Sequence, residues 1–219
     1  MMKKRCGVIK TYDEWCQPKI VSNALELLDK EIPKYKSRIK YVHLCFSTDP
    51  FMYNQEQVRE LSLKVIDKLN SNGIRCTVLT KSTYPKELAG RNGNSLNNEY
   101  GITLVSLDEN FRNEYEPNTA TFKDRIQSLK YLHDKGFKTW VSMEPYPTPN
   151  LVKQDLMKIL EAISFVDKII FGRLNYNVKS SEFKCSKEYY NGLSDSVVTF
   201  CEHNDIAYHI KEGTRVNLQ

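Results

Sequence analysis

The chain has 219 residues, of which 40% are hydrophobic and 27% charged. These values are ordinary for a globular protein and exclude a chain that is mainly a disordered tail. No run approaches the ~20 apolar residues that span a bilayer, and the charged start at residues 1–5 leads into no apolar stretch, so it is not a secretory signal. We therefore expect a cytoplasmic protein with no membrane partner. The formal net charge of +5 is spread among acidic residues, which is typical of a solvated surface.

Short apolar runs and helical stripes alternate along the chain. Runs rich in β-branched or aromatic residues predict buried strands, and apolar residues at helical spacing predict amphipathic helices. In chain order the predicted elements are helix 20–32, strand 41–46, helix 55–69, strand 76–80, a short helix at 85–89, strand 102–106, a helix capped by Thr121, strand 139–143, helix 151–163, strand 168–172, helix 187–203 and strand 206–210.

This order predicts an α/β fold in which helices cover a mostly parallel sheet of about six strands. A closed barrel of eight strand–helix units typically needs ~250 residues, which is more than the chain has. A partial barrel and an open doubly wound sheet are the remaining architectures. The sequence contains no interdomain linker, low-complexity tract or repeat, so residues 1–219 are interpreted as a single domain.

Polar segments follow each predicted strand, at the positions where parallel α/β folds place their active sites. These segments are 47–50, 80–82, 106–109, 144–145, 173–176 and 211–214. Within them Lys81, Ser106 and Glu144 together offer a cation, a hydroxyl and a carboxylate. That combination suits a zwitterionic ligand such as an amino acid.

Other kinds of chemistry have weaker support. The sequence contains no GxGxxG loop, no P-loop and no GxSxG nucleophile motif. Two alternatives remain open. The first is a nucleic-acid-binding α/β domain, suggested by the +5 charge and the 13 tyrosines. The second is an ordinary α/β enzyme that uses the carboxylates Asp49, Asp108 and Glu144 together with Mg²⁺.

Five segments in order resemble the radical SAM proteins related to spore photoproduct lyase, many of which carry the label DNA repair photolyase. The segments are FSTDPF at 46–51, LTKS at 79–82, VSLD at 105–108, YEP at 115–117 and DRI at 124–126. The resemblance extends over about residues 11 to 215. Each motif is weak alone, and the specificity comes from finding all five in order at strand ends.

The resemblance implies a partial (β/α)₆ barrel that binds S-adenosylmethionine (SAM). It also implies that Lys81 and Ser106 hold the carboxylate of SAM. The turn formed by Ser47, Thr48 and Asp49 is expected to lie near the same pocket.

Two further charged residues, Glu116 and Arg125, match positions of the family. The sequence leaves open whether they contact a ligand or pair with each other. The implied reaction is reductive cleavage of SAM to a 5′-deoxyadenosyl radical, which abstracts hydrogen from a substrate. The resemblance does not identify that substrate, because divergent loops recognise it.

The family binds a [4Fe–4S] cluster through the three thiolates of a CxxxCxxC motif, which this sequence lacks. Its six cysteines include no CxxC pair, and Cys6 and Cys16 cannot substitute, because one loop must present three sulfurs. The resemblance to the family therefore leads us to expect that its first strand and cluster loop are missing from this chain. The chain is interpreted either as an N-terminally truncated enzyme or as a cluster-less, non-catalytic relative. We favour truncation because the SAM-contact positions are retained.

Overall fold

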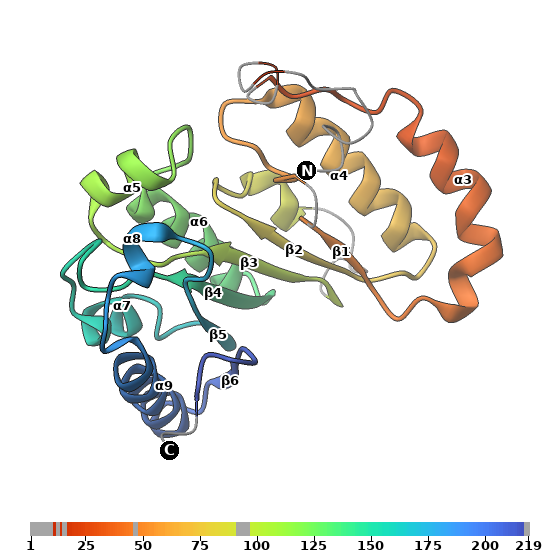
Figure 1. Ribbon diagram of the computed structural model, residues 1–219. Coiled ribbons are helices and arrows are strands. Elements are labelled where there is room, and N and C mark those ends of the chain that lie inside the picture. The colour runs from red at the N-terminus through yellow and green to blue at the C-terminus, as the bar shows by residue number, and fades with distance from the viewer. Residues whose placement is uncertain (1–10, 12–13, 15–16, 46–47, 91–96, 217–219) are drawn as a thin grey trace.

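Six strands form one sheet in the computed structural model, which describes residues 11, 14, 17–45, 48–90 and 97–216 (Figure 1). Every neighbouring pair is parallel, and the strands lie side by side in the order in which they occur along the chain. They are β1 (Val42–Leu44), β2 (Cys76–Thr80), β3 (Glu99–Thr103), β4 (Lys138–Tyr146), β5 (Lys168–Arg173) and β6 (Ala207–Ile210). All six predicted strands are present.

Helices connect the strands along the outer side of the curved sheet (Figure 1). Because the strand order never reverses, right-handed crossovers place these helices on the same face. A doubly wound sheet requires a reversal of order, so the topology confirms the partial TIM-like barrel. The helices are α3 (Ala24–Tyr35), α4 (Glu56–Ser71), α5 (Glu109–Tyr115), α6 (Phe122–Asp134), α7 (Leu156–Ala162), α8 (Val178–Ser181) and α9 (Ser186–His203), with 3-10 turns η1 (Lys36–Arg38) and η2 (Lys86–Gly90). In the described part of the chain, no helix is both long and apolar enough to cross a membrane.

The hydrophobic core lies between the sheet and the helices. Side chains alternate along each strand, so Cys76 and Val78 of β2 are buried, whereas Thr77 and Leu79 on the opposite face are partly exposed. Further fully buried core residues on other elements are Ile102, Val141, Ile169, Phe171, Leu129 and Val197. The inner face of β2, which carries Thr77 and Leu79, is therefore the less buried face of that strand.

Strand β3 begins at Glu99 rather than at the predicted residue 102. Gly101 explains the difference, because a Cβ atom built there would lie 2.4 Å from Cε2 of Trp140 on β4. The glycine thus lets the indole pack on the backbone of β3. The Tyr84 hydroxyl also accepts a hydrogen bond from the Gly101 N–H at 3.1 Å and donates to its carbonyl at 2.6 Å. These tertiary contacts are absent from the local sequence pattern, in which a glycine weakens a strand prediction.

Side-chain caps define two helix starts. The Thr121 hydroxyl accepts a hydrogen bond from the Asp124 N–H at 3.0 Å, which confirms the predicted cap of α6. Helix α7 begins at Leu156 rather than at the predicted residue 151, because Asp155 caps it by accepting from the Met157 N–H at 2.9 Å. The apolar stripe that suggested the earlier start continues into a loop.

Candidate binding site at the strand ends

A turn after β1 is tied to the end of β2 through Asp49. One carboxylate oxygen of Asp49 accepts hydrogen bonds from the Thr80 hydroxyl at 2.6 Å and from the Phe51 N–H at 2.9 Å. The other accepts from the Lys81 N–H at 2.7 Å. Thr48 is exposed, with its hydroxyl 3.5 Å from the carbonyl oxygen of Asp49, and Ser47 lies outside the described residues. The structure therefore brings Asp49 and Lys81 together, as the sequence predicted.

The Lys81 side chain forms one end of a chain of three charges. Its Nζ lies 2.6 Å from Oε1 of Glu116, and Nη1 of Arg125 lies 2.7 Å from Oε2 of the same carboxylate. The exposed fraction of the side chain falls from 38% for Lys81 to 4% for Glu116 and 0% for Arg125. Glu116 and Arg125 thus pair with each other, which is one of the two possibilities that the sequence left open. Lys81 remains partly exposed and is the member of the three that a ligand can reach.

Arg125 joins the end of β3 to the loop that carries Glu116. Its guanidinium donates to the carbonyl oxygens of Thr103 at 2.9 Å and Ala120 at 3.0 Å, and to the Thr119 hydroxyl at 2.7 Å. Burial lowers the pKa of Arg125, and the neighbouring Glu116 carboxylate opposes this shift. A buried guanidinium that donates to three acceptors and pairs with a carboxylate fixes the position of the strand end relative to the loop.

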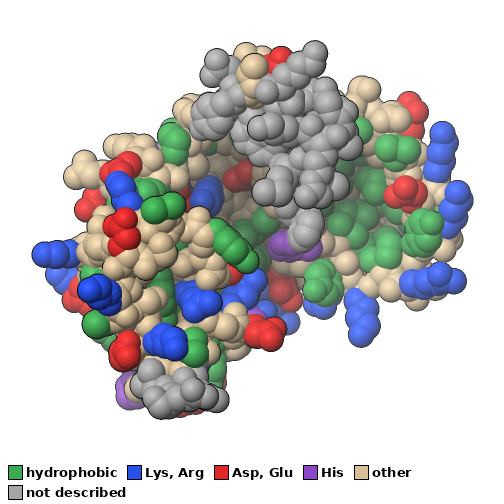
Figure 2. Space-filling model, in the orientation of Figure 1, with side chains coloured by type: hydrophobic (Ala, Val, Ile, Leu, Met, Phe, Trp, Pro, Cys, Tyr) green, Lys and Arg blue, Asp and Glu red, His purple; other side chains and the backbone are tan. Residues whose placement is uncertain are grey.

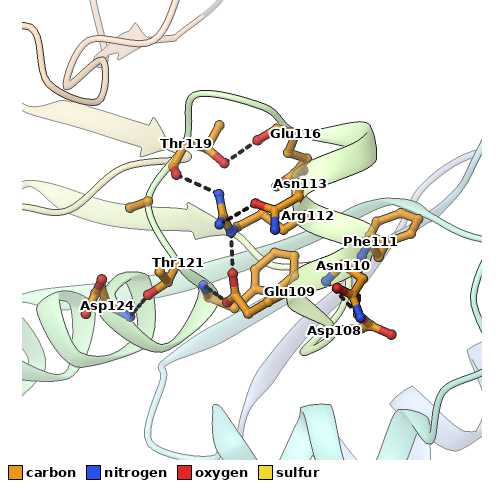
Figure 3. A network of polar contacts seen from close by, with 12 residues as sticks. Asp108, Glu109, Asn110, Phe111, Arg112, Asn113, Glu116, Thr119, Thr121 and Asp124 are labelled. Carbon is orange, nitrogen blue, oxygen red and sulfur yellow. Dashed lines mark hydrogen bonds and ion pairs between the residues drawn. The ribbon is translucent and has the colours of Figure 1, made fainter.

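The loop at 116–121 is also held from helix α5 (Figure 3). Arg112 pairs with Glu109 on the same helix and donates to the Thr119 carbonyl at 3.0 Å. Glu109 in turn accepts from the Phe122 N–H at 2.8 Å, and the Thr119 hydroxyl donates to the Glu116 carbonyl at 2.6 Å. Sequence reasoning missed Arg112 and Glu109, because an acid and a base three residues apart on a helix look like a solvated surface pair.

Ser106 follows β3, the strand that pairs with β2, so it lies at the same edge of the sheet as Lys81. It is fully buried, and its Oγ accepts a hydrogen bond from the Asp108 N–H at 3.0 Å. Asp108 caps α5 by accepting from the N–H groups of Asn110 at 2.7 Å and Phe111 at 3.2 Å. The serine and the aspartate therefore shape the turn from β3 into α5.

Glu144 lies farther around the barrel, at the end of β4. Its carboxylate is 3.0 Å from Nζ of Lys211, beyond the end of β6. The two side chains meet above Gly172 of β5, where a built Cβ would lie 2.9 Å from Cγ of Glu144 and 3.1 Å from Cγ of Lys211. The glycine leaves the space that this ion pair occupies. The structure records Lys211, and not Lys81, as the partner of Glu144.

The three carboxylates of the magnesium alternative have separate partners. Asp49 accepts from β2 and its own turn, Asp108 caps α5, and Glu144 pairs with Lys211. Among the described residues, no three Cys, His, Asp or Glu side chains are grouped so that they could hold a metal ion. The arrangement therefore gives the magnesium alternative no support.

A comparison with protein-family models defines the class of protein. Residues 6–163 match the model of the radical SAM superfamily, and the chain belongs to this superfamily. The resemblance inferred from the five sequence motifs is thereby confirmed.

Solved structures share the fold at low sequence identity. Spore photoproduct lyase complexed with dinucleoside spore photoproduct matches with a TM-score of 0.60 at 14% identity, over 85% of this chain and 66% of that chain. A lyase mutant with bound AdoMet and the same photoproduct gives 0.59 at 14% identity, over 84% and 64%. A domain of pyruvate-formate lyase-activating enzyme from Bacteroides vulgatus gives 0.55 at 14% identity, over 78% of this chain and 98% of that domain.

A curated protein is also similar in sequence. The uncharacterized protein ORF301 of Acidianus two-tailed virus is 26% identical over 141 residues, which are 61% of this chain and 44% of the viral protein. The chain thus spans less than half of this curated relative and just under two thirds of the lyase structures.

Proposed function

We propose that the chain binds SAM at the carboxyl ends of β2 and β3, as part of a radical SAM enzyme. Superfamily membership supports SAM as the ligand. The observation that carries the proposal is the partly exposed Lys81 ammonium, which the buried Glu116–Arg125 pair holds at the end of β2. A lysine fixed in this way is a charge-assisted donor for the carboxylate of SAM.

The other proposed contacts have distinct roles. The hydroxyl of Ser106, on the neighbouring strand end, is the second donor proposed for the amino-acid part of SAM. Because Ser106 is fully buried, this contact requires the turn from β3 into α5 to move. Thr48 and Asp49 form the adjoining turn, in which Asp49 orients the backbone of Lys81. Glu144 supplies a carboxylate for the ammonium group of SAM, in competition with Lys211.

The chemistry that SAM supplies in this superfamily is a 5′-deoxyadenosyl radical, formed when a [4Fe–4S] cluster donates an electron. This sequence has no CxxxCxxC motif, and its described residues include no group of three metal-binding side chains. The residues present do not fit the cluster. The function proposed for them is therefore binding and orienting SAM, and no electron-transfer step is assigned to them.

Calorimetric titration with SAM tests the proposal. Loss of a charge-assisted hydrogen bond in Lys81→Ala is expected to weaken binding roughly 10- to 150-fold, and Lys81→Arg should restore part of the affinity. Lys130→Ala is the matched control, because Lys130 also pairs with a carboxylate, Asp134, but lies on α6. Equal SAM affinity of Lys81→Ala and Lys130→Ala, both folded by circular dichroism, would contradict the proposal.

A second experiment separates a truncated enzyme from a cluster-less relative. The chain and a version extended upstream of Met1 are each reconstituted anaerobically with iron and sulfide. A brown chromophore in the extended protein alone supports truncation. Absence of the chromophore from both proteins supports a cluster-less relative.

Nucleic-acid binding is the second candidate function. It is supported by the net charge of +5 and by the fold shared with a lyase that binds a dinucleoside photoproduct. Figure 2, however, shows Lys and Arg side chains intermixed with Asp and Glu on the face that it presents, whereas nucleic-acid binders concentrate positive charge. Phosphate contacts predict that the logarithm of DNA affinity falls with the logarithm of salt concentration, and a flat response would exclude them.

A further inference from the structure

A cavity of about 420 Å³ lies at the amino-terminal ends of the strands. Its lining includes Arg75, which directly precedes β2, and Lys168, which begins β5. The cavity is thus at the opposite end of the strands from Lys81, and the proposed SAM site does not use it. Its volume is within the ~300–1,000 Å³ of typical small-molecule sites.

One part of the lining is aromatic and consists of Tyr41, His43 and Trp140. The Trp140 indole packs on Gly101, and its ring centroid lies 6.3 Å from that of His43. Nε1 of Trp140 is buried and has no hydrogen-bond partner among the described residues. Burial also lowers the pKa of His43, so its ring is neutral near neutral pH. The three side chains therefore give this part of the lining flat aromatic surface.

The remaining lining residues give the cavity an excess of positive charge. Nη1 of Arg75 lies 3.4 Å from Oε1 of Glu99, and the guanidinium also lies over the Tyr41 ring at 5.4 Å. Lys168 has no ion pair with any carboxylate of the described residues. Two cations therefore face one acid, and the Lys168 ammonium is available to an anion.

We propose that this cavity binds a planar aromatic ring that carries an anionic group, as a nucleoside monophosphate does. The ring packs against the aromatic residues Tyr41, His43 and Trp140, and the anion pairs with Lys168. Aromatic side chains accept a base through its π-face, and a lysine recognises a phosphate as a point charge. The inference does not depend on the SAM proposal, because it uses different residues at the other end of the strands.

The probe is uridine 5′-monophosphate, whose pyrimidine differs from the adenine of SAM. The chain has two tryptophans, so Trp15→Phe leaves Trp140 as the only indole reporter. Saturable quenching of Trp140 fluorescence is expected with uridine monophosphate. Uridine, which lacks the anion, should bind at least about tenfold more weakly, and ribose 5-phosphate, which lacks the ring, should not quench.

Substitutions of individual lysines test whether uridine monophosphate binds in this cavity. In the Trp15→Phe background, Lys168→Ala and Lys168→Met should each weaken binding of uridine monophosphate about tenfold. Lys138→Ala is the matched control, because this exposed lysine begins β4 at the same edge but does not line the cavity. Lys81→Ala should leave the affinity unchanged. Absence of quenching, equal affinities of folded Lys168→Ala and Lys138→Ala, or displacement of the probe by SAM would each overturn the proposal.

Discussion

Arg125 and Glu116 form a buried ion pair next to Lys81 at the candidate site. We predict that Arg125→Ala lowers the free energy of unfolding by roughly 3–5 kcal/mol, because Glu116, whose side chain is 4% exposed, loses its buried partner and keeps only the partly exposed Lys81. Urea unfolding followed by circular dichroism measures the effect. Arg59→Ala is the control, since Arg59 pairs with the exposed Glu56 and should cost at most about 1 kcal/mol. If both variants lose a similar free energy of unfolding, burial of the Arg125–Glu116 pair does not determine its contribution to stability.

The thiols of Cys76 and Cys201 should be unreactive in the folded protein. Burial raises the pKa of Cys76 to about 12 and that of Cys201 to about 11, so both stay protonated below those values, and the thiolate is the reactive form. Cys185 is exposed. Brief treatment with iodoacetamide at about pH 8, followed by peptide mass spectrometry, should find Cys185 labelled and the other two unmodified. Labelling of all three at equal rates in native protein, as expected in urea, would contradict their burial.

At the residue scale, the sequence located the polar residues of the strand ends better than it identified the residues with which they pair. Lys81 and Asp49 were predicted to lie near each other, because carboxyl ends of parallel strands share one edge, and the structure joins them by a hydrogen bond. The pairing of Glu144 with Lys211 was not predictable. It depends on the space above Gly172, which only the packed barrel defines. The ligand contacts assigned to Lys81 and Ser106 stay predictions.

Strand β3 depends on a glycine that the sequence pattern counts against it. We predict that Gly101→Ala lowers the free energy of unfolding by about 1–3 kcal/mol, because the new Cβ would overlap the Trp140 indole. The control is Gly192→Ala in α9, where a Cβ meets nothing within 4 Å and should stabilise the helix by about 0.5–1 kcal/mol. Thermal and urea denaturation should show a lower free energy of unfolding for Gly101→Ala and a higher one for Gly192→Ala.

A double variant tests the cause assigned to Gly101. Combining Gly101→Ala with Trp140→Ala removes the indole, so the extra cost of the Gly101→Ala change should largely disappear in that background. If the cost persists without the indole, the strand requires glycine for a reason other than this contact.

Among the elements, strands with continuous apolar sequence were located best. Strand β2 has the predicted bounds, and β5 differs from prediction only at its last residue. Both are apolar on the side that the helices cover, so the local pattern already contains the signal. The bounds of β3 and α7 were wrong because a tertiary contact and a side-chain cap, respectively, decide them.

At the scale of the whole molecule, we predict that the described sheet unfolds as one cooperative unit. All six strands belong to one continuous sheet, and its core residues form one connected cluster. In the Trp15→Phe background, Trp140 fluorescence and far-ultraviolet circular dichroism should therefore give the same urea midpoint. Two separated transitions would replace the single-domain interpretation of residues 1–219 with at least two folding units.

The sequence by itself determined the alternation of strands and helices, the edge of the sheet that carries the polar residues, and the family. These follow from periodicity and from short motifs, which are local properties of the chain. Periodicity left a doubly wound sheet and a partial barrel open, and the family resemblance implied the barrel. The tertiary structure confirmed the barrel through its strand order, which is a relation between distant segments. It also decided that Glu116 faces both Lys81 and Arg125, since packing brings three separate segments to one carboxylate.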